Sequence, residues 1–115
     1  MSQSEIIDIN LHVYKSIEYI KNNIDKKITL DDLCKEVELS KYYFSRIFKK
    51  HMGISPYRYI LNCKIEAVKK DLRKGIDINT IVNNYEFYDL SHLNKIFSQV
   101  YGVTPLMFKE LDKIK

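Results

Sequence analysis

The hydrophobic positions of the chain recur at intervals of three and four residues, which is the spacing of one face of an α-helix. Residues that can cap a helix precede most of these stretches, because their side-chain oxygens accept free N–H groups of the first turn. These capping residues are Thr29, Ser40, Ser55, Asp77, Asp89 and Thr104. The pattern predicts seven helices near residues 10–23, 30–37, 41–51, 56–74, 78–84, 90–101 and 105–112.

An internal repeat relates the two halves of the chain. At an offset of 49, residues 44–48 match residues 93–97, and residues 53–56 match residues 102–105. Upstream, residues 28–33 match residues 76–81 at an offset of 48. Each copy consists of a short helix, a turn and a longer helix, which is the arrangement of a helix-turn-helix motif. The chain therefore contains two units built on one plan.

The longer helix of each unit has an outward face without carboxylates. The inward positions are Phe44, Ile47 and Phe48 in the first unit and Leu93, Ile96, Phe97 and Val100 in the second. The outward positions are Lys41, Tyr42, Ser45, Arg46, Lys49 and Lys50 in the first and Ser91, Asn94, Lys95 and Ser98 in the second. Solvated helix faces usually mix both signs of charge, whereas donors without carboxylates suit a groove lined by phosphates and base edges. Both helices are therefore predicted to contact duplex DNA.

Composition and charge agree with this interpretation. A chain of 115 residues with 45% hydrophobic and 30% charged residues suits one compact domain or two small lobes. Residues 41–74 contain ten Lys and Arg against two Asp and Glu, a net charge of +8. Because the whole chain carries +4, the remainder carries −4. A basic middle of this kind suggests a polyanionic partner.

Other classes of function find little support in the sequence. No apolar stretch approaches the roughly 20 residues of a membrane span, and no secretion signal precedes the helices, so we expect a cytoplasmic location. The three histidines and two cysteines, His12, His51, His92, Cys34 and Cys63, share no metal-ligand spacing. No phosphate-binding glycine loop or catalytic constellation occurs. We therefore expect no enzyme activity, no metal and no cofactor.

These motifs resemble the DNA-binding domain of the AraC/XylS family of bacterial transcription regulators. The resemblance runs from about Ile17 to Lys109. The segments that carry it most clearly are Ile28–Leu33, Leu39–Lys50, Gly53–Tyr59, Phe87–Phe97 and Tyr101–Pro105. Two helix-turn-helix units in tandem, each followed by Gly-x-Ser/Thr-Pro, form a specific signature.

The resemblance implies an all-α fold of seven helices, with two helix-turn-helix lobes joined by a long central helix. The corresponding ranges are a flexible N-terminus over residues 1–9, a first lobe over 10–54, the linker helix over 55–75 and a second lobe over 76–115. The resemblance also implies that both recognition helices enter successive major-groove segments. Family members often carry a separate N-terminal effector or receiver domain.

The sequence departs from the family pattern at four positions. Glu38 and Glu86 replace the glycine common in the two turns, so neither turn has the residue that adopts positive φ most easily. Val82 is bulkier than the small residue usual in the leading helix of the second unit. Lys95 replaces an arginine in the second recognition helix. We therefore expect the second lobe to read DNA more weakly than the first.

The outward residues divide by their chemistry into two sets. The candidates for base readout are Tyr42, Ser45, Arg46, Ser91, Asn94 and Lys95. Among them, the guanidinium of Arg46 can donate two parallel bonds to guanine, and the Asn94 amide can pair with adenine. The candidates for phosphate contacts are Ser40, Lys41, Lys49, Lys50 and Ser98. Each of these positions can also be an ordinary surface residue.

The sequence is compatible with three functions. The leading hypothesis is a sequence-specific transcription regulator that binds double-stranded DNA and contacts RNA polymerase. The second is an alkyl-transfer DNA repair protein that uses Cys34 or Cys63, because some relatives pair this type of domain with a reactive cysteine. The third is a helical protein-interaction module that does not bind DNA.

Overall fold

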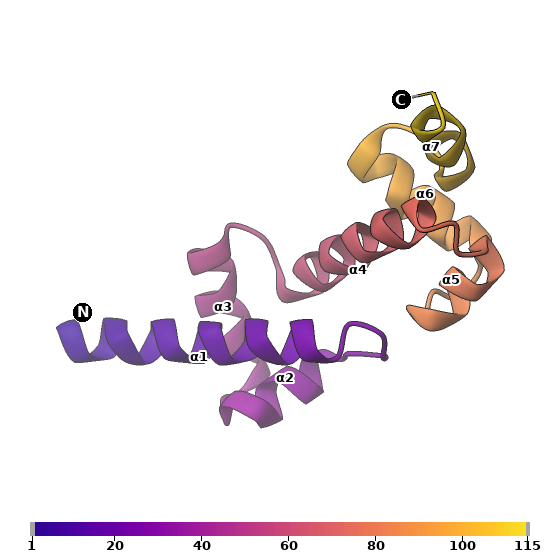
Figure 1. The fold of residues 1–115 in the computed structure, drawn as a ribbon. Coiled ribbons are helices and arrows are strands. Elements are labelled where there is room, and N and C mark those ends of the chain that lie inside the picture. The colour runs from indigo at the N-terminus through magenta and orange to yellow at the C-terminus, as the bar shows by residue number, and fades with distance from the viewer. Residues whose placement is uncertain (1, 115) are drawn as a thin grey trace. The chain divides into compact units, whose positions relative to one another are not determined.

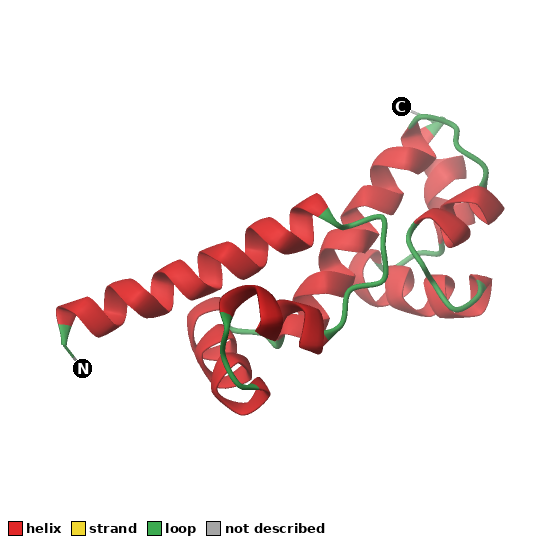
Figure 2. Ribbon diagram, turned by 90° about the horizontal axis from the view of Figure 1, so that it is seen from below, coloured by secondary structure: helices red, strands yellow, loops and turns green. Residues whose placement is uncertain are grey.

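The computed structural model describes residues 2–114, and within this range it contains α-helices and no β-strand (Figure 2). The helices are α1 (Gln3–Asn22), α2 (Leu30–Val37), α3 (Lys41–Met52), α4 (Pro56–Arg73), α5 (Ile78–Asn84), α6 (Leu90–Tyr101) and α7 (Pro105–Asp112) (Figure 1). Helices α2 to α7 begin and end within one residue of the predicted ranges. The all-α fold with seven helices is confirmed. No helix between residues 2 and 114 combines the length and apolarity needed to cross a bilayer.

Helix α1 starts earlier than the sequence indicated. Residues 3–9, predicted to be flexible, form its first turns, and the Ser2 hydroxyl caps them by accepting a bond from the Glu5 N–H. Residues 3–8 are all exposed, so these turns have no buried face whose hydrophobic periodicity the sequence could show. In Figure 1 they extend beyond α2 and α3. Met1 of the predicted range 1–9 and Lys115 of the range 76–115 lie outside the described residues.

The six predicted N-caps are confirmed. The side chain of each accepts a hydrogen bond from the backbone N–H three residues later. At Thr29 the cap is reciprocal, because the Asp32 carboxylate also accepts from the Thr29 N–H. This bond is the main reason that the pKa of Asp32 is lowered. Gly53 and Gly102 end α3 and α6 at positive φ, as their matching places in the repeat predict.

The described chain forms two compact units. Unit 1 contains the residues up to Ile24 and Ile28–Ile60, and unit 2 contains Asp25–Lys27 and the residues from Leu61 onward. Helix α4 therefore contributes its first residues to unit 1 and the others to unit 2. This division differs from the predicted ranges 10–54, 55–75 and 76–115, in which the central helix was a separate segment. The short loop after α1 belongs with unit 2, which no local sequence signal indicated.

Each unit has its own apolar core, and the repeat places equivalent residues in both. Phe44 and Phe48 of α3 are fully buried, as are Leu93 and Phe97 of α6. Val100, predicted to point inward, is instead 41% exposed. Tyr101 takes the inward place, because its ring lies 4.8 Å from that of Phe97 and also packs against α7.

The two helix-turn-helix turns contain the residues of the described chain other than glycine that adopt positive φ. These are Glu38, at φ 58°, and Glu86, at φ 57°. They occupy matching places in the repeat, where the family pattern has glycine. The turns therefore keep the left-handed conformation even though a side chain makes it costly, by roughly 1–2 kcal/mol. The surrounding core and helix packing stabilise this conformation in both units.

Replacement of Glu38 by glycine should stabilise the protein by about 0.5–1 kcal/mol. Glycine removes the left-handed penalty but gains freedom in the unfolded chain, so the net gain is smaller than the penalty itself. Thermal denaturation measures the change. Glu36→Gly, which changes another exposed residue within α2, is the matched control and should destabilise by about 1 kcal/mol. A loss of stability in both variants would contradict the argument from backbone strain.

Candidate nucleic-acid interface

The outward face of α3 is open to solvent and is organised around Arg46. Its guanidinium donates from Nη1 to the Tyr42 hydroxyl at 3.1 Å, and its Cζ lies 5.4 Å from the centre of the Tyr42 ring. The two residues are four apart and therefore lie on the same side of the helix. Tyr42 is 73% exposed, and Ser45 beside it is half-buried. The pair holds the Arg46 fork in one orientation while most of its N–H groups stay available.

Lys41 at the start of α3 already has an acidic partner. Its Nζ lies 2.9 Å from the Asp31 carboxylate on α2, and the hydrogen bond to Asp31 raises the pKa of Lys41. Both side chains are more than half exposed, so the pair is weak and salt can screen it. Lys41 can contact a phosphate only if its ammonium leaves the Asp31 carboxylate. The sequence did not reveal the pair, because Asp31 lies on the preceding helix.

The other predicted phosphate ligands of unit 1 have no such partner. Lys49 and Lys50 are exposed in the last turns of α3, and no carboxylate of residues 2–114 lies within 4 Å of either ammonium. Ser40 is exposed and uses its hydroxyl oxygen to cap α3. Its hydroxyl hydrogen stays available for donation. These three residues lie on the same helix, or at its cap, as Arg46.

The outward face of α6 is smaller and less charged. Ser91 and Lys95 are exposed, whereas Asn94 and Ser98 are half-buried. Their side chains make no hydrogen bond or ion pair with any described residue. The helix contains no acid, and Asp89 caps it through the His92 N–H at 2.7 Å. The structure thus brings the four predicted residues together on one helix, with a single cation among them.

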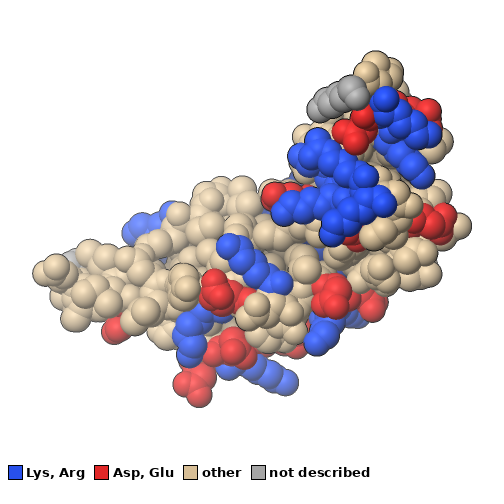
Figure 3. Space-filling model, in the orientation of Figure 1, with Lys and Arg blue, Asp and Glu red and all other residues tan. Residues whose placement is uncertain are grey.

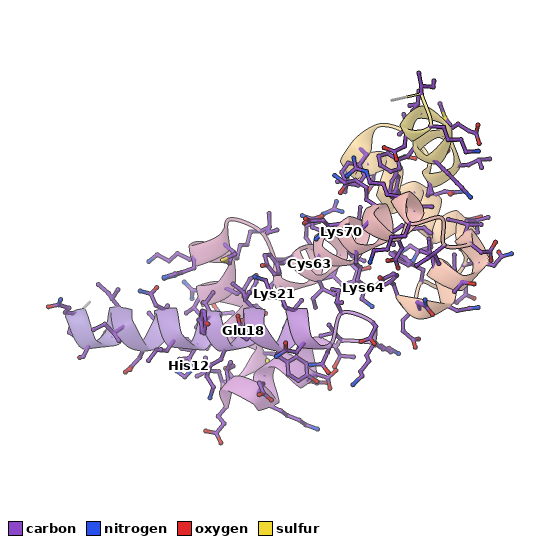
Figure 4. The ribbon with its side chains drawn as sticks, in the orientation of Figure 1. His12, Glu18, Lys21, Cys63, Lys64 and Lys70 are labelled. Carbon is purple, nitrogen blue, oxygen red and sulfur yellow. The ribbon has the colours of Figure 1, made fainter. Side chains whose placement is uncertain are left out.

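The basic run over residues 41–74 is less available than its net charge indicated. Figure 3 shows Lys and Arg side chains gathered over the C-terminal part of α4. Several of these groups have partners inside unit 2: Arg73 pairs with Asp112 at 3.4 Å, and Lys69 lies over the Tyr101 ring. Lys64, labelled in Figure 4, is buried. On α3, by contrast, no carboxylate of residues 2–114 lies within 4 Å of Arg46, Lys49 or Lys50.

The side chains that could support other chemistry are scattered. In the described part of the chain, no group of three or more His, Cys, Asp or Glu residues is arranged to hold a metal ion. Cys34 is buried, and burial, followed by the nearby Asp31, raises the pKa of its thiol. A raised pKa keeps the sulfur protonated and therefore a poor nucleophile at neutral pH.

Comparison with known proteins identifies similar sequences. A family model described as a helix-turn-helix domain matches residues 33–110. Regulatory protein PocR of Salmonella typhimurium is 31% identical over 97 residues, which cover 84% of this chain and 32% of PocR. The bifunctional transcriptional activator/DNA repair enzyme AdaA of Bacillus subtilis is 29% identical over 116 residues, which cover 100% of this chain and 52% of AdaA. The chain thus spans about a third of PocR and about half of AdaA.

Solved structures share the fold. An AraC-type transcriptional regulator from Chromobacterium violaceum superposes with a TM-score of 0.82 at 20% identity, over 88% of this chain and 91% of that one. The C-terminal domain of the two-component response regulator yesN from Fusobacterium nucleatum superposes with a TM-score of 0.71 at 25% identity. That match covers 94% of this chain and 99% of the solved domain.

Proposed function

The chain belongs to the AraC/XylS family of helix-turn-helix DNA-binding domains, and from this premise we propose that it reads a specific duplex DNA sequence with α3 and α6, as part of a transcription regulator. The observation that carries the proposal is that α3 and α6 each have a solvent-facing surface without carboxylates. On the α3 surface, the Arg46 guanidinium is also hydrogen bonded to the Tyr42 hydroxyl. The two helices would enter successive segments of the major groove. RNA polymerase is the partner through which such a complex would act on transcription.

Base readout centres on Arg46 in this proposal. The guanidinium would donate two parallel bonds to O6 and N7 of a guanine, the arrangement that best matches its fork. Tyr42 and Ser45, one turn or one residue away, would contact a neighbouring base or a thymine methyl. In the second lobe Ser91, Asn94 and Lys95 would take the equivalent positions, with the Asn94 amide directed at an adenine. Because α6 has one cation, its share of the affinity would be smaller.

Phosphate contacts would supply most of the affinity that does not depend on sequence. Lys49 and Lys50 are the strongest candidates, since neither pairs with a carboxylate of residues 2–114. Lys41 would contribute after release from Asp31, and Ser40 and Ser98 would donate hydroxyl hydrogen bonds. Charged phosphate contacts displace counterions from DNA, so they make binding sensitive to salt.

Binding to duplex DNA should weaken steeply as salt rises. With three lysines on phosphates, a plot of log affinity against log salt should have a slope of about −3. The measurement uses fluorescence anisotropy on a duplex selected from a randomised pool, with a scrambled duplex as the control for specificity. Equal affinity for both duplexes, or a slope near zero, would refute sequence-specific binding and favour a protein-interaction module.

The alkyl-transfer alternative is disfavoured at Cys34, one of its two candidate cysteines. The Cys34 side chain is 8% exposed, and its raised pKa opposes formation of the thiolate that accepts an alkyl group. The similarity to AdaA extends over this chain's whole length but over only about half of AdaA. We therefore propose DNA binding without a chemical step for this domain. Incubation with methylated duplex DNA, followed by mass spectrometry, should leave the protein mass unchanged.

A further inference from the structure

In unit 1 an ion pair joins the beginning of α2 to the beginning of α3. Lys41 is the first residue of α3, and its ammonium lies 2.9 Å from a carboxylate oxygen of Asp31, the second residue of α2. The Lys41 side chain is 62% exposed and the Asp31 side chain 61%. Both charged groups can therefore be reached by ions from solution and by a phosphate backbone.

The second unit has no equivalent of this pair. The repeat aligns Asp31 with Asn79 at the offset of 48, and Lys41 with Leu90 at the offset of 49. Asparagine has nearly the shape of aspartate but no charge, and leucine cannot pair with an acid. The helix-turn-helix fold of unit 2 forms without the pair, so the fold alone does not explain why unit 1 has it.

The helices of unit 1 do not depend on the pair for their caps. Thr29 and Asp32 cap the start of α2 reciprocally, and the Ser40 hydroxyl caps the start of α3. Neither cap uses the side chain of Asp31 or Lys41. An ion pair that is this exposed also contributes little to folding. Neutralisation of Asp31 should therefore leave α2 and α3 intact.

The pair lies where a helix-turn-helix protein meets the DNA backbone. In such complexes the first helix of the motif crosses the backbone while the second lies in the major groove. The N-terminal end of α3, where Lys41 follows the capping residue Ser40, also favours anions through its free N–H groups. A DNA phosphate and the Asp31 carboxylate are therefore alternative partners for one ammonium.

We propose that Asp31 limits the affinity of unit 1 for DNA by competing with a phosphate for Lys41. This inference rests on the proposed function. Because every duplex carries phosphates, the competition weakens binding to all sequences alike and leaves the base preference of Arg46 unchanged. The competing carboxylate acts in the lobe with the larger set of cations, while the second lobe has the neutral Asn79 at the matching position.

Asp31→Asn tests the proposal, because it gives unit 1 the residue that unit 2 already has. At about 0.05 M salt the variant should bind both the selected and the scrambled duplex roughly twofold to fivefold more tightly than wild type. At about 0.5 M salt the gain should fall below about 1.5-fold, because ions then screen the pair. Fluorescence anisotropy measures both affinities. An unchanged or lowered affinity at low salt would overturn the proposal.

Glu36→Gln is the matched control for net charge. Glu36 is another exposed acid of α2, and no Lys, Arg or His of residues 2–114 lies within 4 Å of its carboxylate. The substitution changes the net charge by the same amount as Asp31→Asn, so any general effect of charge appears in both. The control should gain less than about 1.5-fold in affinity at low salt. A gain equal to that of Asp31→Asn would overturn the proposal.

A double-mutant cycle with Lys41→Ala separates competition from direct repulsion between Asp31 and the phosphates. The gain from Asp31→Asn should be larger when Lys41 is present than in the Lys41→Ala background, because only then does binding break a pair. Equal gains in the two backgrounds would mean that Asp31 acts without Lys41, and would overturn the proposal. A gain confined to the selected duplex would also overturn it, because phosphate contacts carry no sequence preference.

A measurement without DNA distinguishes failure of this inference from failure of the proposed function. The hydrogen bond to Asp31 raises the pKa of Lys41, so the pKa measured by NMR should be lower in Asp31→Asn than in wild type. An unchanged pKa would show that the pair does not form. If the pKa falls but wild type prefers neither duplex, the proposed function is refuted, and the inference with it. If the pKa falls and wild type prefers the selected duplex, yet Asp31→Asn gains no affinity, only the inference is overturned.

Discussion

Replacement of Lys64 by methionine is expected to lower the free energy of unfolding by about 2–3 kcal/mol. The Lys64 side chain is 6% exposed, although lysine is almost never buried. Its ammonium donates to the backbone carbonyls of Lys26 at 2.8 Å and Tyr85 at 2.7 Å. Methionine fills a similar volume but cannot donate, so both carbonyls lose a charge-assisted bond. Burial lowers the pKa of Lys64, and Glu86 and Asp25 oppose this shift.

The position of these acceptors links Lys64 to the turn that precedes α6. Tyr85 immediately precedes Glu86, the left-handed residue of the turn that leads to α6. The Tyr85 hydroxyl also donates to the Asp71 carboxylate at 2.6 Å. Burial, followed by this bond, raises the pKa of Tyr85 to about 12. Because this exceeds its ordinary value of 10.0, the stability that the bond contributes is complete below pH 10 and is lost as pH rises through 12.

Chemical denaturation of Lys64→Met measures the loss. Lys70→Met is the matched control on the same helix (Figure 4), because Lys70 is exposed and makes a 3.9 Å pair with Glu66. An exposed pair of this kind contributes little, so the control should change stability by no more than about 0.5 kcal/mol. Equal stability of Lys64→Met and wild type would show that the two carbonyls find water as a substitute.

Arg46→Ala is expected to weaken binding to the selected duplex by about 1–3 kcal/mol, or roughly 5-fold to 150-fold. The variant should lose its sequence preference at one base pair only, so substitution of that pair should no longer change the affinity of the variant. The Tyr42 contact strengthens this expectation, since it restricts the guanidinium before DNA arrives and reduces the entropy lost on binding. Anisotropy titrations against single-base variants of the duplex measure both effects.

Arg46→Lys separates charge from geometry at the same position. Lysine keeps the positive charge but lacks the planar fork, so it should retain affinity for scrambled DNA while losing the preference at that base pair. Lys95→Ala in the second lobe should cost less than Arg46→Ala, because α6 has a smaller polar surface. An unchanged base preference in Arg46→Ala would remove this residue from direct readout, and a larger loss for Lys95→Ala would reverse the order of the lobes.

The sequence predicted the helices and their caps well because these depend on neighbouring residues. Thr29, Ser40 and Asp89 each satisfy N–H groups a few residues away, and the repeat placed Phe48 and Phe97 in equivalent cores. Such local signals can be identified from the sequence alone. The outward faces of α3 and α6 followed from the same periodicity.

The sequence did not predict features that depend on contacts between residues far apart in the sequence, or on a helix with two apolar faces. Lys64 resembled the surface lysines around it, and its acceptors lie 38 and 21 residues away in the sequence. The start of α1 was missed because Ile6, Ile7 and Leu11 do not fall on a single stripe. Asp31 was not recognised as the partner of Lys41, since the pair joins two helices. In each case the deciding interaction was tertiary.

The placement of the Lys26 carbonyl limits how far the two halves of this chain are interchangeable modules. Along the sequence Lys26 lies between α1 and α2, yet it belongs to unit 2, where its carbonyl accepts a hydrogen bond from the buried Lys64 ammonium. A fragment starting at Leu61 would retain every helix residue of unit 2 but would leave Lys64 short of one acceptor. Because Asp25–Lys27 belong to unit 2 although they lie outside the second copy of the repeat, we expect such a fragment to unfold with lower cooperativity than the complete unit.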